Sequence, residues 1–193
     1  MKENQFYAML SRMKFINRWG LMRNTRNENI CEHSLETAYV AHALGIINNE
    51  VFHGDIDANQ LAVVAMYHDV TEIITGDMPT PVKYHNPVIR DAYREVEEVA
   101  KNQLMQGLPS DLVPRYDAVV GENEDEQINR YVKAADKISA LIKCIEEKGM
   151  GNSDFAKAES TIARSIEEME LPEVKYFMEH FMESYKLTLD ESN

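Results

Sequence analysis

The stretch MYHDVTEIITGDMPTP, residues 66 to 81, places several chemically active side chains close together. His68 and Asp69 follow the apolar residues 61 to 66, and Glu72 comes one helical turn later. At about 100° per residue, His68 shares the inward-facing stripe of the preceding apolar positions. A lone histidine there is more often a satisfied core residue, but buried carboxylates need a positive partner or hydrogen bonds. A divalent cation would meet that need, so the segment indicates a metal site.

Two other segments offer further ligands. His33 lies in NICEHSLETAYVAHALG and aligns with the apolar positions of that segment, while Asn29 and Glu32 have the spacing of a capping box. We therefore expect His33 to point inward near the start of a helix. Asp136 lies in NRYVKAADKISALIKCIEE and shares its side of the helix with Lys143, opposite the main Ile/Leu stripe. Periodicity alone therefore predicts a solvated Asp136.

Two imidazoles and two carboxylates form a borderline-hard donor set that can hold Mn, Co, Fe or Zn. Four protein ligands on an octahedral metal leave positions for water and a phosphate oxygen, which suits metal-assisted hydrolysis. We assign no metal to the remaining histidines, and we expect no second metal. These histidines are His42, His53, His85 and His180.

The elements that must position these residues read as an all-α fold. Helical period runs through nearly every segment, and no run alternates polar and apolar residues long enough to predict a strand. The length and the 44% hydrophobic content predict one domain spanning residues 1–193. Predicted turns lie at 76–87, 107–109, 121–126 and 149–152. The predicted helices are 4–16, 30–48, 58–74, 88–106, 110–119, 125–148, 153–168 and 172–187.

Charge and cysteine content narrow the partners and the compartment. With 20 basic and 33 acidic residues the net charge is −13, which disfavours binding to polymeric nucleic acid or to an anionic membrane. Residues 11–27 carry five basic residues and no acid. They form either a local cationic patch or a solvated basic helix end. Cys31 and Cys144, each inside a helical pattern, are expected to be ordinary buried thiols and not a disulfide or a metal pair, and the sequence offers no signal peptide or membrane span. We expect a cytoplasmic protein with a small substrate.

The pattern of His33, then His68 and Asp69, then Asp136 resembles the H…HD…D signature of the HD-domain metal-dependent phosphohydrolases. The segments INRWGLMRN, CEHS, AMYHDVTEIITGDMPTPVKY and KAADKISA extend this resemblance over almost the whole chain, toward the bacterial 5'-deoxynucleotidases of that superfamily. The resemblance implies a single HD-domain helical bundle and a homodimer. It also implies hydrolysis of deoxyribonucleoside 5'-monophosphates to deoxyribonucleosides and phosphate. One divalent metal per subunit is implied, with cobalt or manganese first and zinc, iron or copper as alternatives.

The resemblance also implies roles for individual residues. It overrides the solvated reading of Asp136 and gives Asp69 a part in catalysis and in substrate binding as well as in metal binding. The implied metal ligands are His33, His68, Asp69 and Asp136. The implied substrate-binding residues are Arg18 at the phosphate, Trp19 and Asp77 at the sugar, and Met78, Pro79 and Thr80 as a wall for the nucleoside.

Physical chemistry agrees with several of these roles and leaves alternatives for others. A guanidinium offers planar donors to phosphate oxygens and opposes their charge, which suits Arg18 as a catalytic group. Glu72 is our hypothesis for proton transfer, as acid or as base, with a carboxylate that orients His68 as the alternative. The alternative interpretation of Trp19 is an aromatic anchor in the core. The alternative interpretation of residues 76–81 is an ordinary segment that ends a helix.

Two other functions are consistent with the same signature. One is a different HD hydrolase chemistry, acting on a nucleoside triphosphate, a cyclic nucleotide or a pyrophosphorylated alarmone. The other is a catalytically silent nucleotide-binding module, which is disfavoured by the presence of all four ligands together with Glu72 and Arg18. For the deoxynucleotidase we expect selectivity for deoxyribose and broad acceptance of bases.

Overall fold

The computed structural model describes residues 4–121, 123 and 125–192. These residues form helices joined by short loops, and no strand occurs among them apart from one isolated antiparallel bridge between Asn17 and Asn29. The predicted all-α fold is therefore confirmed. The helices are α1 (Phe6–Leu10), η1 (Met13–Phe15), α2 (Ile30–Phe52), α3 (Ala58–Tyr67), α4 (Glu72–Thr75), α5 (Thr80–Lys83), α6 (Pro87–Met105), α7 (Val113–Asp117), α8 (Glu126–Gly149), η2 (Ser153–Phe155), α9 (Ala156–Glu167), α10 (Pro172–Phe181), η3 (Met182–Lys186) and η4 (Leu189–Ser192).

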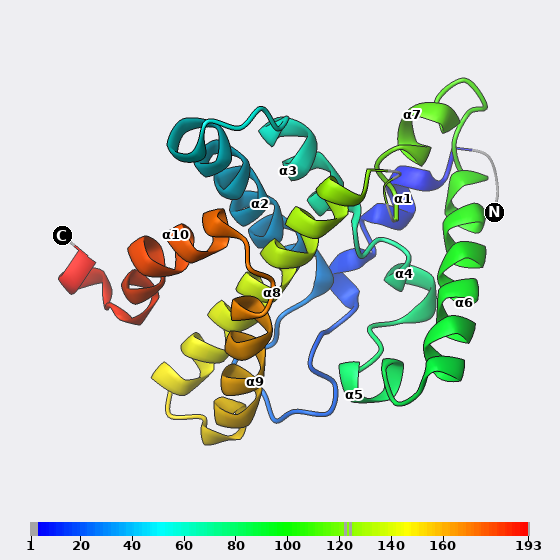
Figure 1. Ribbon diagram of the computed structural model, residues 1–193. Helices are drawn as coiled ribbons and strands as arrows, with labels where there is room; N and C mark the ends of the chain where they lie inside the picture. The colour runs from blue at the N-terminus through cyan, green and yellow to red at the C-terminus, as the bar shows by residue number, and fades with distance from the viewer. Residues whose placement is uncertain (1–3, 122, 124, 193) are drawn as a thin grey trace.

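Figure 1 shows how the helices are arranged, and two clusters of buried apolar side chains hold them together. The larger one joins the inner faces of α2, α3 and α8 and is closed by α9 and α10. The smaller one joins α1, η1 and the end of α6 with Ile30 and Val70. Because Ile30 precedes His33 and Val70 follows Asp69, the predicted ligands lie where the two clusters meet.

Local chemistry explains where the long helices begin and how closely they pack. The Asn29 side chain accepts hydrogen bonds from the backbone N–H groups of Cys31 and Glu32, so α2 starts with His33 in its first turn. Against α3, a Cβ atom on Gly45 would come within 2.8 Å of the Ala58 backbone. The absence of a side chain at this position lets the two helices approach closely.

The prediction of one continuous helix over 58–74 is wrong. The helix α3 ends at Tyr67, residues 68–71 form a turn, and the short α4 follows. The His68 Nδ1 lies 2.7 Å from the Ala65 carbonyl oxygen, which is the acceptor that residue 69 would use in a continuing helix. The next backbone bonds then span three residues, including the one from the Glu72 N–H to the Asp69 carbonyl.

Other boundaries differ less. The predicted helix 4–16 is divided into α1 and η1, and the segment read as an irregular loop at 76–87 contains the short helix α5. Residues 122 and 124 of the predicted turn at 121–126 lie outside the described residues, as do residues 1–3 and 193 of the predicted domain. Across the part of the chain that is described, no helix combines the length and the apolar character needed to cross a membrane.

Candidate metal centre and active site

Side chains from three separate elements converge at one point. His33 comes from the first turn of α2, His68 from the turn after α3, and Asp136 from the middle of α8. One ligand atom from each of these residues lies within 4.8 Å of the other two. Among the described residues, this is the one group of His, Cys, Asp and Glu side chains with such spacing. Asp69 adjoins it, with its Oδ2 3.5 Å from His33 Nε2 and 3.1 Å from His68 Nε2.

The His68 ring provides a test of whether these residues fit a metal. Its Nδ1 is 2.7 Å from the Ala65 carbonyl, so Nδ1 carries a proton and the Nε2 of a neutral ring carries a lone pair. This Nε2 is buried without a hydrogen-bond partner and faces the Asp69 carboxylate, which is another acceptor. Two acceptors that face each other require a cation between them or an added proton. The donor set therefore fits a divalent transition metal.

The electrostatics of the cluster point the same way. Burial alone would lower the pKa of His68, but the Asp69 and Asp136 carboxylates outweigh it and raise the pKa to about 9. Burial opposes ionisation of Asp136, yet the two imidazoles lower its pKa to about 2. The pKa of Asp69 is also held below its ordinary value by both histidines and by Arg18. Negative charge thus dominates the point at which the ring nitrogens meet.

The expectation from periodicity that Asp136 is simply solvated is wrong. Its side chain is 37% exposed, but its Oδ1 lies 3.1 Å from His33 Nε2. The reason is that Asp136, Ser139, Lys143 and Glu147 form a polar stripe of helical spacing that packs against other parts of the chain. Lys143, which had suggested a solvated side, is 4% exposed and pairs with Glu147.

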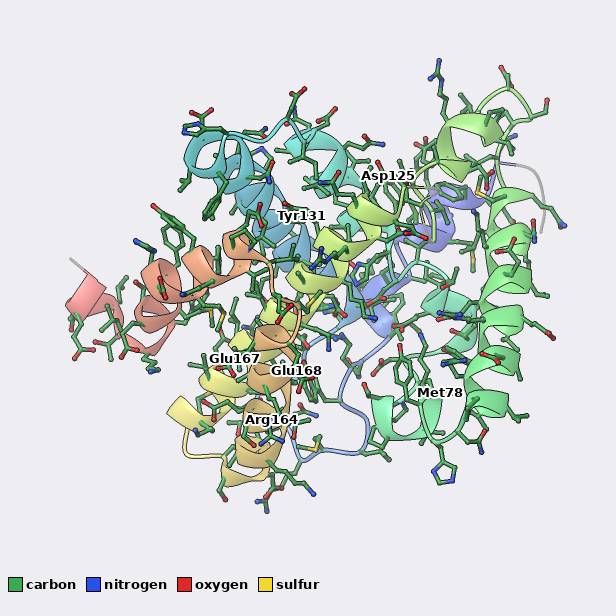
Figure 2. All side chains as sticks on the ribbon, viewed as in Figure 1. Met78, Asp125, Tyr131, Arg164, Glu167 and Glu168 are labelled. Atoms are coloured by element: carbon green, nitrogen blue, oxygen red, sulfur yellow. The ribbon has the colours of Figure 1, made fainter. Side chains whose placement is uncertain are left out.

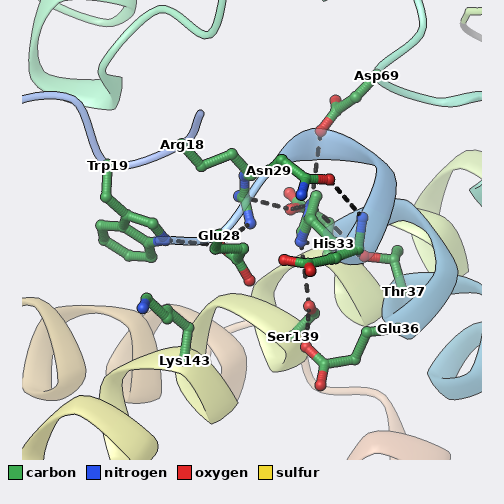
Figure 3. Close-up of polar contacts among 12 residues, drawn as sticks. Arg18, Trp19, Glu28, Asn29, His33, Glu36, Thr37, Asp69, Ser139 and Lys143 are labelled. Atoms are coloured by element: carbon green, nitrogen blue, oxygen red, sulfur yellow. Dashed lines mark hydrogen bonds and ion pairs between the residues drawn. The ribbon is translucent and has the colours of Figure 1, made fainter. Parts of the chain in front are cut away.

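Arg18 and Trp19 are held together by Glu28, a residue that sequence reasoning missed (Figure 3). One Glu28 oxygen accepts from Arg18 Nη1 at 3.0 Å and from Trp19 Nε1 at 2.9 Å. The other end of the Arg18 guanidinium, Nη2, lies 3.8 Å from Asp136. Glu28 is the first acid after the basic stretch 11–27, and that contrast is the signal that could have identified it.

The Trp19 ring rests against Phe155 with 5.3 Å between ring centroids, and its backbone has φ 61°. Within residues 11–27, Arg18 is turned inward, whereas the side chains of Arg23 and Arg26 are 80% and 62% exposed. A cationic surface patch is therefore not what this stretch contributes to the site. Its contribution is one guanidinium beside the carboxylates.

Glu72 lies at the start of α4 with its carboxyl group buried. Its Oε2 has no hydrogen-bond partner, and burial together with the carboxylates of Asp69 and Asp77 raises its pKa to about 10. Because the His68 Nδ1 is taken by the Ala65 carbonyl, the His68 ring is oriented by the backbone and not by Glu72. This environment favours the protonated, neutral form of Glu72.

The segment after α4 contains the remaining predicted residues. Asp77 is half-buried, and burial raises its pKa while the Arg18 charge and the Trp19 backbone N–H lower it. That backbone contact joins Asp77 to Trp19. Met78 lies on the segment that leads into α5 (Figure 2) and is half-buried, as is Pro79. Thr80, the first residue of α5, is exposed. The substrate roles of these three residues stay predictions.

Fold and site together define an HD-domain phosphohydrolase. An HD-domain phosphohydrolase from Listeria innocua has the same fold, with a TM-score of 0.82 and 26% identity, covering 94% of this chain and 88% of that one. The HD phosphohydrolase DatZ of cyanophage S-2L shares the fold with a TM-score of 0.68 and 21% identity, covering 97% of this chain and 100% of that one.

The family follows from the sequence comparison. A family model described as 5'-deoxynucleotidase YfbR-like matches residues 5–185. A 5'-deoxynucleotidase of Yersinia pestis strain Pestoides F is 46% identical over 189 residues, which are 97% of this chain and 96% of that protein. The chain belongs to the YfbR-like 5'-deoxynucleotidase family, and it is a metal-binding phosphohydrolase that acts as a phosphomonoesterase.

Proposed function

We propose that this chain hydrolyses deoxyribonucleoside 5'-monophosphates with one divalent metal per subunit, bound by His33, His68, Asp69 and Asp136. The products are a deoxyribonucleoside and phosphate. The observation that carries this proposal is the buried, unpartnered His68 Nε2, which faces a carboxylate inside the cluster of predicted ligands. DatZ, which shares the fold, has been solved bound to dA and one catalytic Zn²⁺ ion.

When bound, a divalent metal makes water a better nucleophile at neutral pH and polarises the phosphate. Glu28 holds Nη1 of Arg18, while Nη2 faces the carboxylate cluster 3.8 Å from Asp136. This guanidinium binds the phosphate and opposes its developing charge. Glu72, as a buried acid with an available proton, donates to the departing 5'-oxygen of deoxyribose. Trp19 and Asp77 hold the sugar, and the Trp19 backbone N–H contacts the Asp77 carboxylate.

Cobalt or manganese is the proposed metal, with zinc, iron or copper as alternatives, because an N/O donor set suits several of these ions. The proposed compartment is the cytoplasm, where the two free thiols stay reduced. Cys144 is buried as expected, but the expectation of a buried Cys31 is wrong, because Cys31 lies in the first turn of α2 and is exposed. The proposed assembly is a homodimer. No polymeric nucleic acid or membrane is a proposed partner, given the net charge of −13.

Metal removal and readdition test the proposal. Metal-depleted protein should not hydrolyse dAMP, and Co²⁺ or Mn²⁺ should restore hydrolysis more readily than Mg²⁺. The Asp136→Asn variant should fold like the wild type, as judged by circular dichroism, but retain less metal after gel filtration. Full turnover in the presence of a strong chelator would rule out the metal mechanism. Unchanged metal content in Asp136→Asn would remove Asp136 from the ligand set.

A further inference from the structure

The two ring nitrogens of His33 are both contacted by the polar stripe of α8. Asp136 Oδ1 lies 3.1 Å from Nε2, and Ser139 Oγ lies 3.1 Å from Nδ1. The Ser139 hydroxyl in turn donates to Glu36 Oε2 at 2.6 Å (Figure 3). Glu36 belongs to α2, one turn after His33. A chain of hydrogen bonds therefore runs from the half-buried carboxylate of Glu36 through Ser139 to His33 in the predicted metal site.

The number of available protons determines which group donates and which accepts in each of these hydrogen bonds. An ionised carboxylate only accepts hydrogen bonds, so the single hydroxyl proton of Ser139 goes to Glu36. Ser139 Oγ is then left as the acceptor for the Nδ1–H of His33. Because a neutral imidazole carries one proton, the Nε2 of His33 keeps its lone pair and presents it to the predicted metal site. The Thr37 hydroxyl lies 3.5 Å from both ring nitrogens and so does not select between them.

We infer that Glu36 and Ser139 are positioning residues that hold His33 in its Nδ1–H tautomer and thereby set the affinity of the site for its metal. This inference rests on the proposed metal site. Groups that orient a metal-ligating histidine in this way change metal affinity by about 10- to 100-fold. Ser139 and Asp136 are three residues apart on α8, so one helix face both fixes the tautomer and supplies a ligand.

The first test is Co²⁺ binding to metal-depleted protein, measured by the absorption of the bound ion. Ser139→Ala removes the acceptor for Nδ1–H and should weaken Co²⁺ binding by about 10- to 100-fold. Glu36→Ala should weaken it as well, because the Ser139 hydroxyl is then free to donate to Nδ1 and to favour the Nε2–H tautomer. Wild-type affinity in both variants would overturn the inference.

Ser34→Ala is the matched control. Ser34 is a buried serine next to His33 in sequence, but its hydroxyl has no hydrogen-bond partner. This substitution removes the same oxygen atom from the same part of the fold without touching the chain of hydrogen bonds. It should leave Co²⁺ affinity unchanged, and a loss equal to that of Ser139→Ala would show that truncating any buried serine here is sufficient.

The second test reads the tautomer directly, by ¹⁵N NMR of the imidazoles in metal-free protein, with His33 assigned through a His33→Asn variant. We expect Nδ1 to be protonated in the wild type, because Ser139 Oγ accepts from it, and to lose that proton in Glu36→Ala, where the Ser139 hydroxyl can donate to Nδ1. A role limited to holding α2 against α8 would not move this signal. An unchanged tautomer in both Glu36→Ala and Ser139→Ala would overturn the inference even if affinity fell.

The two tests separate failure of this inference from failure of the proposed function. If the wild type did not bind Co²⁺, the proposed metal site would fail, while the tautomer measurement would still decide the role of Glu36 and Ser139. If the wild type bound one Co²⁺ and both Ser139→Ala and Glu36→Ala bound it equally well, the metal site would stand and this inference would fail.

Discussion

At the scale of single residues, Glu72 combines burial, an unpartnered oxygen and a pKa raised to about 10. We expect Glu72→Ala to retain metal and substrate binding but to lose about two to four orders of magnitude in turnover, the usual contribution of a general acid or base. Steady-state kinetics on dAMP, with metal content measured in parallel, check this. Wild-type turnover in the variant would reduce Glu72 to a structural role.

Trp19 and Asp77 carry the prediction on sugar choice. An apolar wall beside the 2'-carbon would leave the hydroxyl of a ribonucleotide without its hydrogen bonds, at a cost of about 1–3 kcal/mol, or roughly tenfold to a hundredfold in specificity. Deoxyribonucleoside 5'-monophosphates of all bases should be hydrolysed, and ribo 5'-monophosphates and 3'-monophosphates scarcely at all. Trp19→Ala should narrow the difference between dAMP and AMP in kcat/KM. Equal values for the two substrates with the wild type would contradict the prediction.

How far single residues could be predicted depends on whether the local pattern contains their partners. His33 shares a stripe with apolar residues, so its burial could be predicted from α2 alone. Asp136 could not be placed in this way, because its surroundings come from α2 and from the turn after α3. The roles of Glu28, Glu36 and Ser139 could not be predicted for the same reason, since these residues act through contacts between segments distant in sequence.

At the scale of elements, α8 anchors the loop that carries Arg18 and Trp19. The buried carboxylate of Glu147 accepts from the backbone N–H groups of Thr25 and Arg26 at 2.9 and 3.1 Å. It also accepts from the side chains of Lys143 and Asn152. The loop between η1 and α2 is therefore held at two places. Glu147 binds its backbone at Thr25 and Arg26, and the Asn17–Asn29 bridge joins its two ends.

We expect Glu147→Gln to lower the free energy of unfolding by about 3–5 kcal/mol, the cost of breaking a buried charge pair, because Lys143 then lacks its carboxylate. Denaturant unfolding measures this. The neighbouring half-exposed Glu146→Gln is the matched control and should change stability little. A loss of less than 1 kcal/mol in Glu147→Gln would show that the anchor is not important for stability.

The same carboxylate gives stability a dependence on pH. Burial opposes ionisation of Glu147, but its hydrogen bonds from Lys143, Asn152 and the loop amides hold its pKa well below the ordinary 4.5. The unfolded chain therefore binds more protons on acidification, and the contribution is present above about pH 4.5 and lost below it. The gap in stability between wild type and Glu147→Gln should shrink below this pH. A gap that stayed constant down to pH 3 would contradict the assignment.

Most elements could be predicted, because helical period is a local property. The long helices α2, α6 and α8 agree with their predicted ranges to within a few residues. The break at His68 could not be predicted from periodicity, because it depends on a side chain that binds a backbone carbonyl of its own helix. That break also brings His68 and Asp69 out of a regular helix and into the turn where the two apolar clusters meet.

At the scale of the whole molecule, a homodimer and a single domain over residues 1–193 stay predictions. The segment YFMEHFMESY, residues 176–185, is partly buried and partly exposed. Phe177 packs in the larger apolar cluster, while Phe181 and Tyr185 are 44% and 37% exposed. We expect light scattering to report twice the mass of one chain. A single-chain mass at working concentration would refute the dimer.

The left-handed backbone of Trp19, with φ 61°, restricts how this enzyme can evolve. Most side chains enter that conformation at a cost, and β-branched ones do so least readily, whereas Gly, Asn and Asp enter it easily. Single substitutions that would reshape an apolar wall with Val, Ile or Thr therefore carry a penalty unrelated to the substrate. If Trp19 forms the proposed wall beside the sugar, the substitutions that fit this backbone, Gly, Asn and Asp, remove that wall or make it polar. They would then broaden the range of sugars accepted more readily than they would create a new narrow one.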